Sequence, residues 1–507
     1  MKKLNIIIYL VTIALFASSC DDFLSERPSK SSDIVPSTLA DMESILVGMF
    51  RGDCITPHLT FGTGEVALSA ELEKRVPGSY SVDIVQAATW EREHSGTNKD
   101  YMWMYRYQNI FRSNLVFSCL PNIEASEAEI NEIKAKAAFR RAISYMELLD
   151  VYTLPYCEKN LEEPGLVLTE QTGFDYSLKR ASLKDTYDFI EKDILLALTV
   201  KAKIINQMGA NSPNRVTDAA ANALASRFYL MKHDYENAKK YAKAALDLYG
   251  IDKLMDYTAI GYSDRVDNGT ITIDGRTIDF EVKYPTTNFG FNPLTWTENY
   301  FNGTSAGSGF SSGFSIDNLP SEAHIATFDE DGSKEHDARW KYFYVQNYAY
   351  LKGKPIDIPY YLKPASQYTL SVPEMILNMA ECEARAGDWQ TGLDWVNKLR
   401  AKRIEAAGEV NLTASSKDEA IAKILRERRR ENGPFKRLYD IRRYNSNDYA
   451  ADDVTLTTKF YSYTVAGVDQ SSAIKTYTLA PDAREWAFMI PEGDVLAGKG
   501  ELLQNTY

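Results

Sequence analysis

The sequence predicts a mainly α-helical fold, built as a scaffold of tetratricopeptide-like helical hairpins that carries an irregular insertion of loops and short strands. Three observations predict it. Apolar residues recur at helical spacings of three, four and seven in several segments. One of these segments is repeated 154 residues further along the chain. The helical spacing is missing between the two copies, from Tyr249 to Pro373.

The first of the two copies is the clearest helical hairpin. It runs from 218 to 249 and breaks at Asp234, where a second apolar stripe begins with Ala238. Small alanines on facing stripes let two antiparallel helices approach closely. In the second copy, 373 to 403, Asp388 takes the place of Asp234, so we expect the same hairpin there.

Two further helical units precede these copies. Residues 101–120 and 127–152 form another candidate hairpin, and a fourth unit is expected near 39–51 because a stack of such units usually needs three or more members. Between the copies, 270–284 alternates like a strand hairpin around Asp274-Gly275, a favoured two-residue turn. We therefore predict one domain over 20–507, with the scaffold in 20–250 and 370–450 and irregular, ligand-side segments in 251–369 and 451–507.

The N-terminus has the pattern of a secretory signal. Two lysines after Met1 precede an apolar stretch from Ile6 to Phe16, and Ala-Ser-Ser then leads to Cys20. The stretch is too short for a transmembrane helix, which needs about 20 apolar residues. We predict a lipoprotein signal peptide over 1–19 and diacylation of Cys20; the alternative is an ordinary signal peptide with an incidental cysteine.

Composition excludes several classes of function. A net charge of −13 argues against nucleic acid and against electrostatic binding to anionic lipid, and favours neutral or weakly charged ligands. No CxxC pair exists, so a zinc site is not expected and no cofactor is predicted. Four cysteines follow the signal, and the sequence is compatible either with free thiols or with a single disulfide among them: Cys54, Cys119, Cys157 and Cys382.

Several motifs in fixed order give the chain a family resemblance. They are Cys20-Asp21-Asp22-Phe23-Leu24, Trp103-x-Tyr105 with Ile110 and Asn114, Ala138-Phe-Arg-Arg-Ala142, the basic segment 424–431 with 435–442, and Met489-Ile-Pro-Glu492 before Leu503-Gln-Asn505. Together with the repeated hairpin they resemble the SusD/RagB family of outer-membrane nutrient-binding lipoproteins across nearly the whole chain. The sequence departs from the family pattern at Thr153 and Met489, which indicates a divergent branch.

The resemblance implies a function and a location. It implies a surface lipoprotein, held in the outer membrane by its lipid and facing the cell exterior, that binds a nutrient glycan and passes it to a TonB-dependent SusC-like transporter. The acidic pair after Cys20 resembles the export signal of such lipoproteins. A peptide or another nutrient in the same arrangement is the alternative ligand.

Carbohydrate binding needs flat aromatic faces and a few oriented polar groups. The resemblance places ligand contacts in the stretch before the first long helix and in the glycine-rich insertion. The predicted binding residues are Tyr80, Trp90, Arg92, Trp296, Tyr300, Phe301, Asn302 and Phe310. Tyr342, Phe343, Tyr344, Tyr348 and Tyr350 alternate more like a strand or a buried edge and are interpreted as structural.

Catalysis is the less favoured hypothesis. Carboxylate pairs such as Asp264 and Asp267 could serve a glycosidase, and 329–331 could equally be a solvated turn or a loose calcium site. A GxSxG match at 309–313 lacks the strand and helix that a nucleophile elbow needs, and no HExxH occurs. The arginine-rich run from Arg426 to Arg443 is interleaved with acidic residues, which favours salt-bridged helices over a phosphate site. We therefore predict a protein that is not an enzyme.

Overall fold

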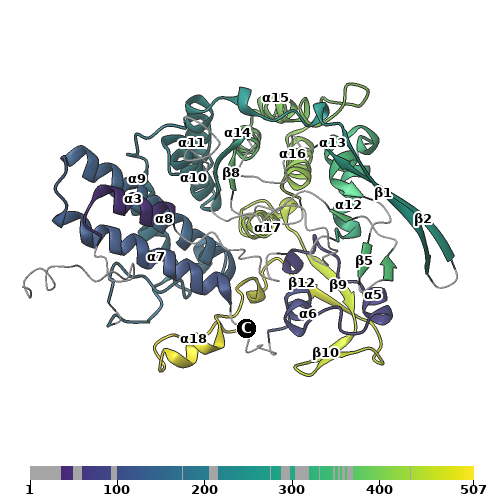
Figure 1. Ribbon diagram of the computed structural model, residues 1–507, viewed down its shortest axis with the longest axis horizontal. Helices are drawn as coiled ribbons and strands as arrows, with labels where there is room; N and C mark the ends of the chain where they lie inside the picture. The colour runs from purple at the N-terminus through teal and green to yellow at the C-terminus, as the bar shows by residue number, and fades with distance from the viewer. Residues whose placement is uncertain are drawn as a thin grey trace, which may run out of the picture.

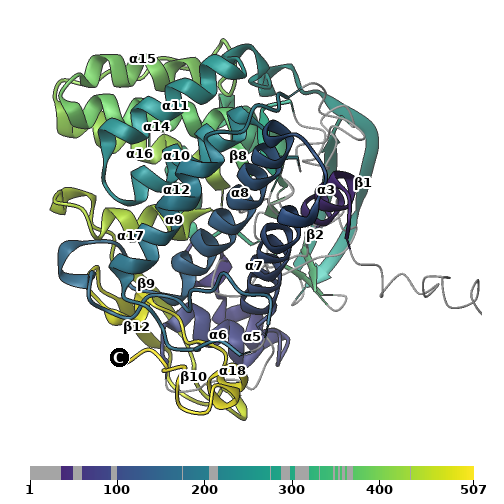
Figure 2. The same ribbon diagram turned by 90° about the vertical axis from the view of Figure 1, so that its left-hand side faces the viewer.

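A computed structural model describes most of the chain after the predicted signal (Figures 1 and 2). The described residues are 36–48, 60–92, 100–173, 175–204, 215–273, 276–286, 297–302, 319–330, 332–345, 349–351, 354–356, 360–361, 369–433 and 436–507. The predicted signal peptide, Cys20 and Cys54 lie outside these ranges.

The described chain is mainly helical, as predicted. Its α-helices are α3 (Leu39–Val47), α5 (Ala70–Arg75), α6 (Val82–Thr89), α7 (Tyr101–Cys119), α8 (Glu127–Tyr152), α9 (Leu183–Ala197), α10 (Asp218–Met231), α11 (Tyr235–Leu248), α12 (Glu322–Asp329), α13 (Ala338–Phe343), α14 (Val372–Ala386), α15 (Trp389–Arg400), α16 (Lys417–Asn432), α17 (Arg437–Tyr444) and α18 (Glu492–Ala497). None of these helices combines the length and the apolar character that a membrane crossing requires.

Side-chain caps explain where the scaffold helices begin. Ser126 and Glu129 form a reciprocal capping box at the start of α8. Asp234 caps α11 and Asp388 caps α15, each by accepting a hydrogen bond from the third residue of its helix. The two aspartates that matched in the sequence therefore play the same structural role in the two hairpins.

The repeated hairpins pack side by side, α10–α11 and α14–α15, with α11 against α14 (Figures 1 and 2). Gly392 occupies in α15 the position that Ala238 occupies in α11. A Cβ on Gly392 would lie 2.7 Å from the carbonyl oxygen of Ala380, so the backbones of α14 and α15 are in close contact there. The predicted α7–α8 hairpin is present, and α3 packs against both of its helices.

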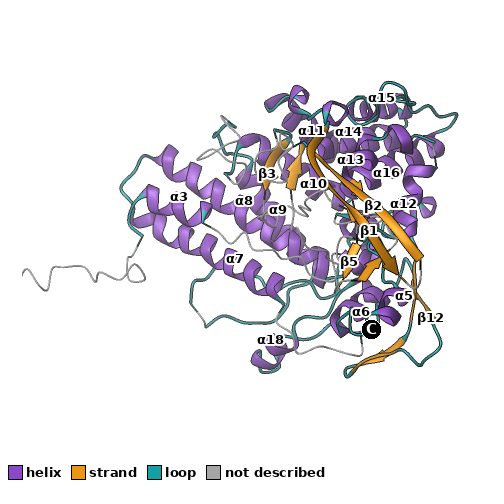
Figure 3. Ribbon diagram, turned by 45° about the vertical axis from the view of Figure 1, so that its right-hand side comes forward, coloured by secondary structure: helices purple, strands orange, loops and turns teal. Residues whose placement is uncertain are grey.

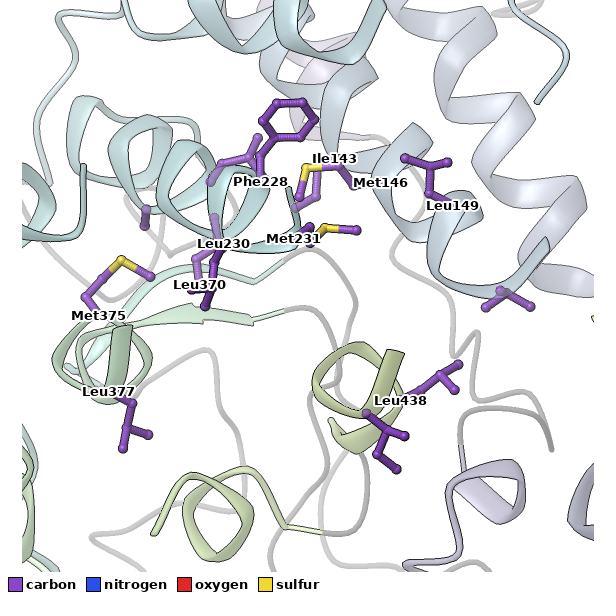
Figure 4. Close-up of a cluster of buried hydrophobic side chains, with 14 of the residues drawn as sticks. Ile143, Met146, Leu149, Phe228, Leu230, Met231, Leu370, Met375, Leu377 and Leu438 are labelled. Carbon is purple, nitrogen blue, oxygen red and sulfur yellow. The ribbon is translucent and has the colours of Figure 1, made fainter. Parts of the chain in front are cut away.

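One buried cluster of apolar side chains joins the scaffold from within (Figure 4). It brings together residues from α8, α10, α14, α17 and the short strand β8. The side chains labelled in the close-up are Ile143, Met146, Leu149, Phe228, Leu230, Met231, Leu370, Met375, Leu377 and Leu438. The cluster extends from Phe61 to Leu502, so segments far apart in the sequence share it.

The strands are short apart from one hairpin, and all pair in antiparallel twos. They are β1 (Tyr262–Ile273), β2 (Arg276–Pro285), β3 (Asn299–Asn302), β4 (Tyr344–Val345), β5 (Ala349–Leu351), β6 (Lys354–Ile356), β7 (Tyr360–Tyr361), β8 (Thr369–Ser371), β9 (Leu456–Phe460), β10 (Ser462–Thr464), β11 (Gly467–Asp469) and β12 (Lys475–Leu479). The β1–β2 ribbon reaches along the outside of the molecule (Figure 3). It confirms the predicted strand hairpin, since Ile273 pairs with Arg276 around the expected turn.

Two details of the insertion differ from the prediction. Helices α12 and α13 lie inside it, although no helical pattern was evident there. Tyr342 and Phe343 belong to α13, so the strand interpretation was wrong for them. It holds for Tyr344 in β4 and Tyr350 in β5, and Tyr348 lies outside the described residues. Helix α13 has only six residues and is capped by Asp337, and so short a helix leaves too few turns to show an apolar period.

Candidate ligand-binding site

The first predicted group of contact residues lies around the end of α6. Tyr80 and Trp90 are both buried, each with 3% of its surface exposed. The indole Nε1 of Trp90 donates to the carbonyl of Gly62 at 2.9 Å, and the hydroxyl of Tyr80 accepts from the backbone N–H of Ser69 at 3.0 Å. Both rings therefore hold the 60–92 segment together from inside.

Trp90 also has a special backbone conformation. It caps the C-terminus of α6 with φ of 60°, the left-handed region that bulky residues rarely adopt. Its buried indole and the hydrogen bond to Gly62 hold it there. A strained backbone conformation of this kind persists only where surrounding contacts hold the residue in place, and such residues occur often at functional sites.

Arg92 is equally enclosed. Its guanidinium lies 3.9 Å above the ring of Phe488 and donates to the carbonyl of Glu485 at 2.6 Å. Burial lowers the pKa of Arg92 to about 10. The side chain thus ties the end of the 60–92 segment to the C-terminal part of the chain.

The second predicted group lies on β3, at the start of the glycine-rich insertion. Tyr300 and Phe301 have no exposed surface. Phe301 packs edge-on against Phe139 of α8 with ring centres 4.8 Å apart, and the guanidinium of Arg140 lies 4.6 Å from its ring centre. Asn302 ends β3 opposite Thr369 of β8, and its side chain is not described.

Five of the eight predicted contact residues are therefore buried, namely Tyr80, Trp90, Arg92, Tyr300 and Phe301. None presents an aromatic face to solvent in this conformation, so direct contact with a ligand would require the covering chain to move. Trp296 and Phe310 lie outside the described residues. Ligand contact stays a prediction for all eight residues.

Both ends of the 303–318 segment are fixed to other parts of the fold. At one end β3 pairs with β8 beside α14, and at the other Pro320 forms an isolated bridge with Val66. The N–H of Ala67 donates to the carbonyl of Leu319 at 2.7 Å. The 303–318 segment thus begins at the helical scaffold and ends beside the 60–92 segment. One predicted group of contact residues lies near each of its ends.

A buried polar network holds the returning end. Nδ1 of His324 in α12 lies 2.6 Å from a carboxylate oxygen of Glu65, and its Nε2 lies 2.7 Å from the hydroxyl of Tyr344. Arg429 of α16 contacts both oxygens of Glu65, at 2.8 and 3.0 Å. Burial alone would raise the pKa of Glu65, but Arg429 and His324 lower it to about 2, so the carboxylate is ionised.

Sequence reasoning missed this network because its members are far apart in the chain. Glu65 and His324 are separated by 259 positions, and no spacing rule relates them. The one available signal was composition, since His324 is one of only five histidines.

The arginine-rich run confirms the predicted salt-bridged helices. In α16 and α17, Arg428 and Arg443 converge with Arg385 on the buried carboxylate of Glu381. Arg430 pairs with Glu427, and Arg426 with Glu330.

The described residues give no support to a metal site. They contain no group of three His, Cys, Asp or Glu side chains placed to hold an ion. Cys119, Cys157 and Cys382 are free thiols, which answers the disulfide question for these three.

One helix face in the described chain is apolar and exposed. On α7, the exposed fractions are 51% for Tyr101, 44% for Met104 and 39% for Phe111. The rings of Tyr101 and Tyr105 are stacked, with centres 5.8 Å apart. Exposed apolar patches of this kind mark interaction surfaces.

The geometry defines a class: a tetratricopeptide-like helical scaffold that carries an irregular insertion fixed to it at both ends. Sequence models of two related families match the chain, one described as "Starch-binding associating with outer membrane" over 22–230 and one as "SusD family" over 372–507. The chain belongs to the SusD/RagB family. The resemblance inferred from its motifs is thereby confirmed.

Solved structures of the same fold agree. A SusD superfamily protein from Bacteroides thetaiotaomicron is 17% identical with a TM-score of 0.64, covering 93% of this chain and 100% of its own. A SusD-like carbohydrate binding protein from Bacteroides vulgatus is 16% identical, with a TM-score of 0.58 and coverage of 92% and 97%. Surface glycan-binding protein A from Bacteroides fluxus is 15% identical, with a TM-score of 0.57 and coverage of 94% and 99%. Comparison with curated proteins by sequence finds no match.

Proposed function

We propose that this chain is an outer-membrane lipoprotein, anchored through Cys20 and facing the cell exterior, that binds a nutrient glycan and delivers it to a TonB-dependent SusC-like transporter. Binding takes place without catalysis. The observation that carries the proposal is the insertion fixed at both ends, by β3 on the scaffold and by Pro320 beside Val66. The names of the carbohydrate-binding and glycan-binding relatives support the same ligand class.

The burial of Tyr300 and Phe301 assigns the proposed contacts to different residues of the insertion. Substituting a fully buried ring would disturb the core and affect ligand binding indirectly. Trp296 and Phe310 are therefore the better candidates for direct stacking on sugar rings, with Asn302 as a polar partner. Tyr80, Trp90 and Arg92 are proposed to act indirectly, by holding the 60–92 segment to which the returning end of the 303–318 segment is bonded.

A panel of host, plant and microbial polysaccharides tests this proposal by titration calorimetry. A Trp296→Ala, Phe310→Ala variant should lose at least about tenfold in affinity for whichever polysaccharide binds, which corresponds to about 1.4 kcal/mol. Phe111→Ala on α7 is the matched control, because it removes an exposed aromatic ring that belongs to neither predicted group of contact residues. Unchanged binding by the double variant removes the insertion from the site, and new reducing ends on incubation overturn the non-catalytic assignment.

The transporter contact is assigned to the exposed face of α7. Helix α3, the first described helix after the proposed tether, packs on α7. Tyr, Met and Phe at helical spacing are enriched in protein interfaces. A photocrosslinker at position 111 in intact cells should join the chain to a β-barrel transporter, whereas one at Leu248 on α11, 42% exposed, should not. Equal crosslinking from both positions contradicts the assignment.

A peptide ligand is the second candidate, since helical hairpin stacks often hold extended peptides. Hydrogen exchange separates the two. Glycan binding should protect the 303–318 segment and the chain on either side of it, at 297–302 and 319–330, whereas protection confined to α10, α11, α14 and α15 would favour a peptide.

A further inference from the structure

Arg437 has fewer partners than a buried arginine normally has. Its side chain is 8% exposed, and Glu65 is the one carboxylate within 4 Å of it in the described chain, at 3.7 Å. That separation is too long for a hydrogen bond. Its Nε has no hydrogen-bond partner among the described atoms. Buried polar groups are nearly always hydrogen-bonded, so an exception of this kind needs an explanation.

The one carboxylate beside Arg437 is already engaged. Glu65 accepts from Arg429 on both oxygens and is hydrogen-bonded to His324. Two guanidinium groups therefore share a single negative charge. Glu381 also receives close contacts from three arginines, but two of these have a further close carboxylate partner: Arg385 pairs with Asp452 at 2.6 Å and Arg443 with Asp440 at 2.9 Å.

The electrostatics of the two arginines agree with this geometry. Burial is the main cause that lowers the pKa of Arg437, and the neighbouring charge of Arg429 lowers it further. A like-charged pair around one carboxylate leaves room for a second negative charge. Arg429 is accessible, since 21% of its side chain is exposed.

The pair lies in the region where the glycan site is proposed. Glu65 follows Gly62, whose carbonyl accepts from Trp90, and its own carbonyl accepts from the N–H of Ser321 at 2.8 Å. Arg429 and Arg437 thus lie beside Glu65, the residue whose backbone holds Ser321 at the returning end of the 303–318 segment.

We propose that Arg429 and Arg437 form a recognition site for an anionic group, a carboxylate or a sulfate, carried by the glycan ligand. The inference rests on the proposed function and narrows its ligand class to acidic glycans. Guanidinium groups suit this task because their fixed fork matches the geometry of both anions. The net charge of −13 disfavours a polyanion at long range, so recognition depends on these short contacts and on separated rather than dense charges along the glycan.

Matched polysaccharide pairs test the proposal on the purified mature protein. A polygalacturonate with most of its carboxylates methyl-esterified is titrated against its fully esterified form, and a sparsely sulfated galactan against its desulfated form. The first pair tests a carboxylate and the second a sulfate. We expect one charged member to bind at least about tenfold more tightly than its neutral counterpart, and the preference to fall as salt is raised. Binding only to neutral members overturns the anionic site and leaves the proposed function intact, whereas a failure of every polysaccharide to bind overturns both.

Arg437→Met supplies a readout that a purely structural arginine would not give. Removing an unsatisfied buried charge while keeping its bulk should leave the melting temperature unchanged or raise it, and should abolish the preference for the charged member. Arg426→Met on α16, the helix that also carries Arg429, is the control, because Arg426 pairs with Glu330 and its loss should change neither property. A fall of several degrees in melting temperature for Arg437→Met shows that the residue is structural and overturns the proposal.

Discussion

The two matched hairpins are held mainly by interactions between residues close in the sequence, whereas the insertion between them is held by contacts with distant residues. In α10–α11 and α14–α15, the outer helices α11 and α15 bury one apolar stripe against α10 and α14, which are buried on nearly all sides, and α10, α11 and α15 each begin at a side-chain cap. In the insertion, β3 and Pro320 are held by contacts with β8 and Val66, far away in the chain. The scaffold can therefore be inferred from local sequence, whereas the geometry of the insertion depends on residues that only the fold brings together.

The largest effect should come from the buried charge network of the scaffold. Glu381→Gln leaves Arg385, Arg428 and Arg443 facing a neutral amide in a fully buried site. Breaking a buried ion pair costs about 3–5 kcal/mol, and urea unfolding should show a loss of that size. Glu330→Gln, which removes an exposed partner of Arg426, should cost less than about 1 kcal/mol. Similar losses in the two variants would contradict this account.

Replacing the carboxylate of Glu65 by an amide should destabilise only the region around the returning end of the 303–318 segment. Glu65→Gln weakens the contacts with Arg429 and His324 and should cost about 2–3 kcal/mol, because buried hydrogen bonds to a charged group are lost. Hydrogen exchange should accelerate in α12 and at 319–321, while α10 and α14 keep their protection. Equal acceleration in α14 would show that the insertion and the scaffold open as one unit.

These two variants show why the sequence predicted one region better than the other. Asp234 and Asp388 could be matched because each caps the helix that begins at the next residue, through the N–H three positions further on. Trp90 was chosen as a binding aromatic, but its indole packs inward against Gly62, and nothing in the local sequence indicates that orientation. Likewise, the sequence places Tyr300 and Phe301 in a loop, whereas in the structure they lie on β3, which pairs with β8, and both rings are buried. In irregular segments the direction of a side chain depends on residues far away in the sequence. A single sequence does not show which of those residues become its partners.

Close packing of the repeated hairpins gives the next prediction. Gly392→Leu places a side chain against the backbone of Ala380 and should destabilise the protein by about 2–3 kcal/mol, because overpacking forces the two helices apart. Gly392→Ala, with the Cβ alone, should cost less than Leu. The urea midpoint of the two variants measures the difference, and a Leu variant as stable as the wild type would mean that α15 can shift freely.

A buried carboxylate of α8 should make the scaffold sensitive to pH. Asp150 is enclosed, and burial raises its pKa to about 7, although Arg442 and Arg227 act in the opposite direction. Its folded pKa is above the usual unfolded value near 4, so its contribution to stability is complete below about pH 4 and is lost as the pH rises through 7. Asp150→Asn should therefore stabilise the protein at pH 8 by about 1–2 kcal/mol and leave it nearly unchanged at pH 4. Thermal melts at both values measure this, and equal shifts at the two would refute the assignment.

The smallest effect should come from the β1–β2 ribbon. Thr270 lies opposite Asp279 and donates to its carboxylate at 2.8 Å, on a face where both side chains are exposed. Exposed cross-strand pairs contribute roughly 0.2–1 kcal/mol, and valine keeps the β-branched shape of threonine. Thr270→Val should change the global unfolding free energy by less than about 0.5 kcal/mol, with any faster hydrogen exchange confined to the ribbon. Because β1 and β2 pair mainly with each other, a loss as large as that of Gly392→Leu would show that the ribbon is part of the cooperative core rather than an appendage of it.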